Sequence, residues 1–134
     1  MSATPGDIVI RVDPRPDIEG LRVLFLAAWA APTDADFAAI WARSLAHLAA
    51  YDGDRLVGYI NVALDGGVHA SLYDTTVHPE YRRGGIGTAL VREAVRVAGE
   101  RGADWLHVDF EPHLLAFYRG CGFGPTEAGL MRLR

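Results

Sequence analysis

The sequence contains no lysine and a single cysteine, Cys121, among its 134 residues. One cysteine cannot form a disulfide within the chain, so we expect stability to come from a hydrophobic core and the location to be a reducing cytoplasm. No apolar run approaches the roughly 20 residues of a membrane span, and no signal peptide is recognisable near Met1. The net charge of −4 also lacks the basic excess typical of nucleic-acid-binding proteins. These absences leave a small molecule or another protein as the expected partner.

Length and periodicity predict one domain over residues 1–134, because typical domains contain roughly 100 to 150 residues. The apolar spacing predicts the order strand, two helices, three strands, helix, strand, helix and strand, with Asp34 as the N-cap of the second helix. The strands are expected at 8–12, 48–51, 56–64, 70–77, 105–110 and 130–133, and the helices at 17–29, 34–48, 86–101 and 114–119.

The most informative segment is 77–90, in which a predicted strand runs through two arginines and several glycines into a helix. The first N–H groups of a helix have no internal partner and favour an anion, and glycines let the backbone approach it closely. A dinucleotide-binding fingerprint does not fit, because its third glycine position is occupied by Leu90. A nucleotide-hydrolase phosphate loop requires a lysine, which the chain lacks. The segment therefore predicts a different kind of phosphate-binding turn.

Two segments of this sequence are informative together. Residues 82–87, Arg-Arg-Gly-Gly-Ile-Gly, follow Val77-His78-Pro79, and residues 115–123 read Leu-Ala-Phe-Tyr-Arg-Gly-Cys-Gly-Phe. The first segment resembles motif A of the GNAT superfamily of N-acetyltransferases, the second resembles the late motif of that superfamily, and the two have the separation seen in the family. The resemblance implies an α/β (α+β), GNAT-like fold. Such a fold has a central mixed, mostly antiparallel sheet that is splayed near its middle and flanked by the four predicted helices.

The resemblance also implies a co-substrate, acetyl-CoA, and roles for individual residues. Tyr118 would face the cofactor sulfur and protonate the departing thiolate. Seven residues before Tyr118, where many members have asparagine, this chain has Glu111. The implied cofactor-binding residues are Thr76 and Val77 beside pantetheine, Arg82, Arg83, Gly84, Gly85, Ile86, Gly87 and Thr88 at the pyrophosphate, and Tyr118.

Transfer to an amine requires a base, because an alkyl ammonium with a pKa of about 10.4 is almost entirely protonated at neutral pH. Asp74 and Glu111 are the leading candidates for this base. Asp74 shares its strand face with Thr76, and Glu111 lies at the end of the neighbouring strand, so both are expected to reach an acceptor in the gap of the splayed sheet. The sequence leaves open whether either is only a surface or helix-capping carboxylate. The other candidates near the gap are Asp109, His69 and His107. No histidine or cysteine spacing indicates a metal site.

The predicted function is acetyl transfer from acetyl-CoA to an amine of a small-molecule or protein acceptor, by a monomer or homodimer. The alternative is a non-catalytic module of the same fold that binds coenzyme A or a partner protein. Transfer to a hydroxyl, or of a longer acyl chain, also stays open at this point.

Overall fold

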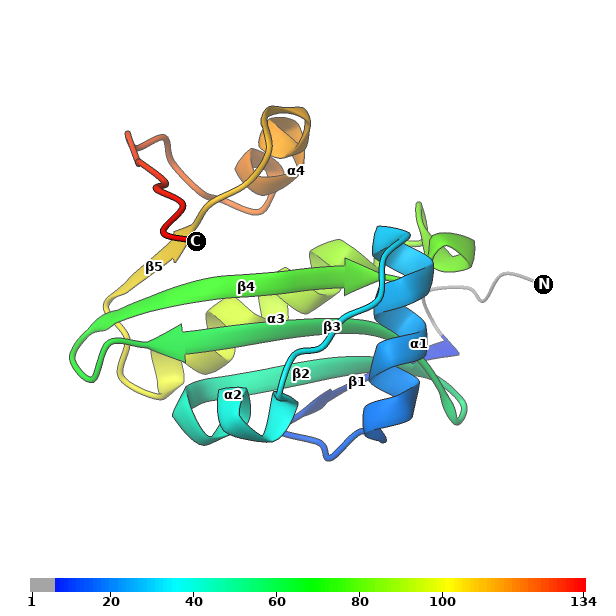
Figure 1. Ribbon diagram of the computed structural model, residues 1–134. Coiled ribbons are helices and arrows are strands. Elements are labelled where there is room, and N and C mark those ends of the chain that lie inside the picture. Colours follow the sequence, from blue (N-terminus) through cyan, green and yellow to red (C-terminus); the bar gives the residue numbers. More distant parts are fainter. Residues whose placement is uncertain (1–6) are drawn as a thin grey trace.

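A computed structural model of the chain describes residues 7–134. Within these residues one sheet is formed by β1 (Ile8–Val12), β2 (Ser44–Asp52), β3 (Arg55–Leu64), β4 (His69–Val77) and β5 (Trp105–Val108). The strands lie side by side in their order along the chain (Figure 1). The first four are antiparallel to their neighbours, whereas β5 runs parallel to β4. The mixed, mostly antiparallel sheet confirms the predicted fold class.

Helices cover both faces of the sheet. The helical elements are α1 (Ile18–Trp29), α2 (Phe37–Arg43), α3 (Ile86–Glu100), α4 (Leu115–Gly120) and two 3-10 turns, η2 (Pro79–Tyr81) and η3 (Pro112–Leu114). α1 and α2 lie on one face and α3 on the other, while α4 lies beyond the β5 edge (Figure 1). One buried cluster fills the space between the sheet and α3, and a second one, around Phe25, Phe37 and Tyr59, lies under α1 and α2.

α3 packs closely on the sheet because β3 carries a glycine beneath it. A Cβ atom at Gly58 would lie 2.9 Å from Leu90 Cδ1 and 3.2 Å from Ile86 Cγ2. Both of these α3 side chains are buried. The missing side chain at Gly58 therefore sets the distance between the sheet and the first turns of α3.

The boundary between α2 and β2 differs from the prediction of a helix from Asp34 to about Leu48. α2 is shorter, its N-cap is Asp36, and β2 begins at Ser44. The Ser44 hydroxyl lies 2.5 Å from Asn61 Oδ1 on β3, which joins the start of β2 to the sheet. β2 is buried and pairs with a strand on each side. These pairings outweigh the helix propensity of its leucines and alanines.

The end of the chain also differs from the prediction. The strand expected at 130–133 is absent: residues 124–134 form no strand or helix, and Leu130, Met131 and Leu133 are largely exposed. β5 ends at Val108, two residues earlier than predicted. An alternating apolar pattern forms a strand only where a neighbour satisfies its backbone groups, and this segment pairs with none.

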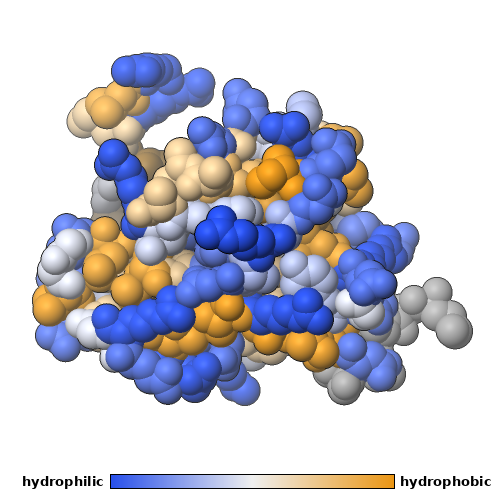
Figure 2. Space-filling model, turned by 90° about the horizontal axis from the view of Figure 1, so that it is seen from below, coloured by the Kyte–Doolittle hydropathy of each residue, from blue (hydrophilic) through white to orange (hydrophobic). Residues whose placement is uncertain are grey.

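The underside of the molecule, toward β1 in Figure 1, has a mixed surface. Figure 2 shows apolar patches on this face that are interrupted by hydrophilic side chains. Val9 on β1 is one of the exposed apolar residues of the chain. Within residues 7–134, no helix is both long and apolar enough to cross a membrane.

Candidate active site

β4 and β5 separate halfway along β4. They pair over the first part of β4 only, as far as Leu72 and Val108. Beyond this point β4 continues to Val77, while the chain that follows β5 turns away toward α4 (Figure 1). The edge of β4 from Tyr73 onward therefore has no β5 neighbour, and the predicted splay of the sheet is confirmed.

A bulge in β4 lies beside this gap. Between two paired positions, β4 has two residues, Asp74 and Thr75, where β3 has one, Ile60. Asp74 has a positive φ of 57°, a conformation that is uncommon for a residue other than glycine. Bulges bend a strand and re-aim its side chains. The bulge therefore changes the direction of β4 where the gap begins.

At the end of β4, some backbone N–H and C=O groups face the gap, where β5 does not pair with them. The His78 N–H donates to the Val57 carbonyl oxygen of β3 at 2.8 Å. Because backbone groups alternate in direction along a strand, the N–H and C=O of Val77 point away from β3 and into the gap. An extended ligand in the gap can therefore pair with Val77.

Thr76 has a structural role in addition to its position on β4. Its side chain is buried, donates to the Asp74 carbonyl oxygen at 2.8 Å and accepts a hydrogen bond from Trp29 Nε1 at 3.2 Å. Trp29 ends α1, so this bond attaches α1 to the bulge. The sequence did not indicate Trp29 as a site residue, because it appears there only as the last residue of a predicted helix.

A cavity of about 610 Å³ opens at the gap between β4 and α4. Its walls are the end of α1, the edge of β4, the turn before α3 and the helical segment that leads into α4. The lining residues are Ala28, Trp29, Thr75, Thr76, Val77, Tyr81, Arg82, Arg83, Gly85, Ile86, Gly87, Thr88, His113, Leu114, Phe117 and Tyr118. Every residue predicted to bind the cofactor, except Gly84, thus lines one cavity.

The N-terminus of α3 faces this cavity without a side-chain cap. Gly85 is the N-cap residue, has a φ of 80°, and no side chain hydrogen-bonds to the first turn. The following residues Ile86, Gly87 and Thr88 line the cavity. Their N–H groups cannot be satisfied within the helix, and the helix dipole adds partial positive charge there. This end of α3 is therefore suited to bind an anion.

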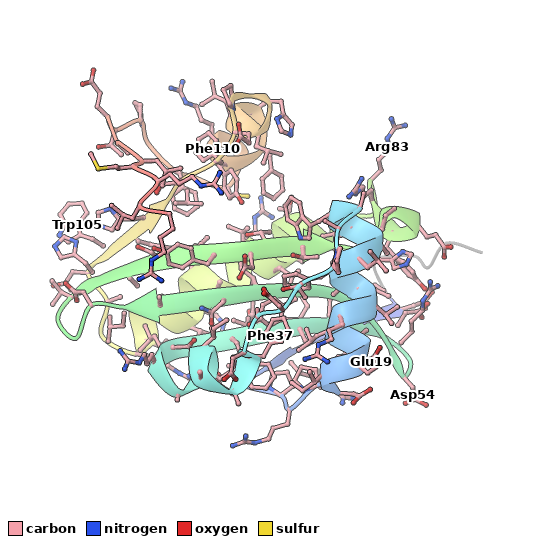
Figure 3. All side chains as sticks on the ribbon, viewed as in Figure 1. Glu19, Phe37, Asp54, Arg83, Trp105 and Phe110 are labelled. Carbon is pink, nitrogen blue, oxygen red and sulfur yellow. The ribbon has the colours of Figure 1, made fainter. Side chains whose placement is uncertain are left out.

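The side chains of the two arginines in the turn have different surroundings. Arg82 Nη2 donates to the Ala28 carbonyl oxygen at 3.0 Å, so it ties the turn to the end of α1. Arg83 has a positive φ of 69°, and its side chain extends away from the fold into solvent (Figure 3). The guanidinium of Arg83 is therefore free to approach a charged group that projects from the cavity.

Gly87 lies where α3 and α4 approach each other closely. A Cβ atom at this position would lie 3.3 Å from Phe117 Cζ and 3.7 Å from Val77 Cγ2. The glycine therefore lets the α3 N-terminus, the β4 edge and α4 converge around the cavity.

Tyr118 of α4 lines the cavity. The residue is 5% exposed, and its ring stacks on Phe110 with 4.7 Å between the ring centroids. Phe110 belongs to the segment that joins β5 to α4 (Figure 3). The Tyr118 hydroxyl donates to Thr75 Oγ1 at 3.3 Å across the gap. The ring is thus fixed by packing, and the hydroxyl is held at the open edge of β4.

The two leading base candidates occupy different positions. Asp74 lies at the surface on the bulge, and partial desolvation by the surrounding protein raises the pKa of its carboxyl group. Glu111 is exposed at the N-cap position of η3, but its side chain makes no capping hydrogen bond. Neither Asp74 nor Glu111 lines this cavity or the second one described below. Asp74 is flanked on its strand by Tyr73, which lines the second cavity, and by Thr75, which lines the first one, whereas Glu111 has no such immediate neighbour. Asp74 is therefore the better placed of the two carboxylates.

The remaining base candidates, His69, His107 and Asp109, line a second cavity of about 420 Å³ further along β4. His69 Nδ1 lies 2.8 Å from His107 Nε2, within hydrogen-bond distance. Among residues 7–134 no three histidine, cysteine or acidic side chains are grouped so that they could hold a metal ion.

Comparisons with known proteins agree with this geometry. The sequence model of the acetyltransferase (GNAT) family matches residues 17–123. A mycothiol acetyltransferase of Nocardia farcinica is 38% identical over 114 residues, which cover 78% of this chain and 37% of that protein. A mycothiol acetyltransferase of Mycolicibacterium vanbaalenii is 41% identical over 66 residues, which cover 49% of this chain and 22% of the relative. The chain thus spans less than two fifths of the length of these relatives. The crystal structure of a Trypanosoma brucei acetyltransferase has the same fold, with a TM-score of 0.80, 24% identity and coverage of 96% of this chain and 99% of that one.

Proposed function

Because the chain belongs to the acetyltransferase (GNAT) family, we propose that it transfers the acetyl group of acetyl-CoA to the amine of an acceptor molecule. One observation carries this proposal. The uncapped N-terminus of α3, the free edge of β4 and the Tyr118 hydroxyl all line the same cavity. A pyrophosphate, an extended amide chain and a thioester, which follow one another in acetyl-CoA, would meet these three features in turn.

The pyrophosphate would lie at the N-terminus of α3. The backbone N–H groups of Ile86, Gly87 and Thr88 supply donors without a competing cap. Arg83 adds a solvent-exposed positive charge outside the turn, where it can approach the phosphates without burial. The amides of the pantetheine arm would continue from there along β4 and pair with the Val77 backbone as an added strand.

The proposed acetyl transfer uses the side chains of Asp74 and Tyr118. The neutral amine nitrogen attacks the carbonyl carbon of the thioester, a C–N bond forms, and the C–S bond breaks. The amine loses one proton, which Asp74 accepts directly or through water, and a raised pKa makes its carboxylate a stronger base. Tyr118 donates a proton to the departing thiolate. Because a thiol with a pKa of about 8.5 already leaves readily, the contribution of this acid is modest.

The proposal is tested first by binding. Aspartate in place of Gly85 would put a negative charge beside the pyrophosphate and should weaken the binding of acetyl-CoA by about tenfold or more, as measured by calorimetry. Gly102→Asp is the matched control, because Gly102 also has a positive φ and an open surrounding but lies at the opposite end of α3. Equal affinities in folded Gly85→Asp and Gly102→Asp would exclude the phosphate-binding turn.

Catalysis is tested by following free thiol release from acetyl-CoA across a panel of amines. Release that depends on an amine supports the proposed transfer. Tight binding of acetyl-CoA without thiol release for any amine would favour the non-catalytic coenzyme A-binding module instead.

A further inference from the structure

The second cavity, of about 420 Å³, lies on the sheet surface beside the proposed active site. Ala70 and Leu72 of β4 belong to the buried cluster under α3. Side chains alternate between the two faces along a strand, so the residues between and beside them point to the opposite face, on which α1 and α2 lie. The cavity is lined by Ala63, Leu64, Asp65, His69, Ser71, Tyr73, His107 and Asp109.

The two cavities are neighbours along β4. Tyr73 lines the second cavity, Thr75 lines the first one, and Asp74 lies between them. Two residues of a strand span about 7 Å, so an amine beside Asp74 would leave the rest of its molecule to extend toward His69. On the basis of the proposed function, we propose that the second cavity binds the non-reacting part of the acceptor, and that this part is a polyhydroxylated ring, as in an amino sugar.

The lining of the cavity carries an unpaired carboxylate. Within residues 7–134, the Asp109 side chain has no hydrogen-bond or ion-pair partner. Asp65 differs, because its Oδ1 accepts the Gly67 N–H at 2.6 Å and holds the turn between β3 and β4. No arginine lines the cavity. Asp109 is therefore available to accept hydrogen bonds from hydroxyl or ammonium groups of a ligand.

The paired histidines present both kinds of hydrogen-bonding group. The bond between His69 Nδ1 and His107 Nε2 uses one nitrogen of each ring. In a neutral pair, one of the two remaining nitrogens is a donor and the other is an acceptor. A hydroxyl group both donates and accepts, so neighbouring hydroxyls can satisfy both. An alkyl chain would leave these polar groups unsatisfied, which is unfavourable when water is displaced.

Tyr73 adds a flat surface at the end of the cavity nearer the active site. Its side chain is 53% exposed and lines the cavity beside Ser71, whose hydroxyl adds a further polar group. An aromatic ring with a polar tip contacts the apolar face of a sugar while its edge stays hydrated. Together, the carboxylate, the histidine pair and this ring favour a polyhydroxylated amine over a linear polyamine.

The test compares three acceptors by free thiol release: methyl glucosaminide, spermidine and butylamine. We expect the wild-type protein to show a kcat/KM for methyl glucosaminide at least about tenfold above those of spermidine and butylamine. Asp109→Asn should lower the ratio of the methyl glucosaminide value to the butylamine value by about tenfold and leave the affinity for acetyl-CoA unchanged. Asp104→Asn is the matched control, because Asp104 is an exposed carboxylate next to β5 that lines neither cavity.

A second variant distinguishes the loss of a ligand contact in the second cavity from a structural disturbance of β5. His107→Ala should also lower the ratio of the methyl glucosaminide value to the butylamine value. A preference for spermidine, or equal losses for all three acceptors in Asp109→Asn, would overturn the assignment of the second cavity while the proposed acetyl transfer stands. Absence of thiol release with every amine would overturn both.

Discussion

Replacing Gly58 with alanine should destabilise the protein and also weaken its affinity for acetyl-CoA. The added carbon would lie 2.9 Å from Leu90 Cδ1, 3.1 Å from Ala50 Cβ and 3.2 Å from Ile86 Cγ2. Favourable carbon contacts are about 3.5 to 4.0 Å long, so each of these groups must move by several tenths of an ångström. The φ of Gly58 is not positive, so the alanine backbone is unstrained and the change isolates packing.

The size of the destabilisation by Gly58→Ala depends on how little the contacted groups can move. Leu90 and Ala50 are fully buried, and Ala50 Cβ is fixed to the backbone of β2, so it cannot rotate away. Overpacking of a dense core costs typically about 1 to 3 kcal/mol of unfolding free energy, which corresponds to a fall in Tm of roughly 4 to 12 °C for a domain of this size. Ile86 is the first residue of α3, so its displacement moves the N–H groups that we assign to the pyrophosphate.

Thermal and urea unfolding of Gly58→Ala would measure the loss, and calorimetry would measure the affinity for acetyl-CoA. Gly99→Ala is the matched control, because a Cβ at Gly99 on α3 meets no atom within 4 Å. The same change there should stabilise the protein by about 0.5 to 1 kcal/mol. Adding Leu90→Ala to Gly58→Ala should cost less than the sum of the single changes, because the cavity accommodates the new methyl group. A Gly58→Ala variant as stable as the wild type would refute this account of α3 packing.

Three further predictions concern proton transfer and pH. Tyr118→Phe keeps the ring, so single-turnover rates should fall about 10- to 100-fold while the affinity for acetyl-CoA barely changes; equal rates would remove the acid role. Activity should rise with pH as the carboxyl of Asp74, with its raised pKa, loses its proton, and an Asp74→Asn profile identical to wild type would reject this base. Stability should fall in two stages on acidification. Burial lowers the pKa of His47, so stability is lost first as the pH falls below its ordinary value of 6.5. For Asp13, burial opposes ionisation, but hydrogen bonds from Arg101 and the His47 backbone outweigh it and lower the pKa, so stability falls again below the ordinary value of 3.8. Urea unfolding should show a smaller first stage in His47→Gln, with a remainder from His78, whose pKa burial also lowers; an unchanged curve would contradict the assignment.

The glycine turn before α3 and the family could be predicted because they depend on adjacent residues. Gly85 has a positive φ and Gly87 lies at a close contact with Phe117, and both positions appear directly as glycines in the sequence. The late motif indicated Tyr118 in the same way, and this residue lines the cavity. By contrast, the positions of Asp74 and Glu111 looked equivalent in the sequence, and only the bulge in β4 distinguishes them.

Local patterns in the sequence determined most elements of this protein, because helix and strand periodicity and glycine turns are short-range properties. The tertiary structure decided which segments became strands where two patterns competed. Ser44 begins a strand rather than extending a helix because β1 and β3 supply hydrogen-bonding neighbours to β2, whereas residues 130–133 have no such neighbour and stay irregular. Only the folded sheet could bring Trp29 to Thr76 and His69 to His107, because these contacts join residues that are far apart in sequence.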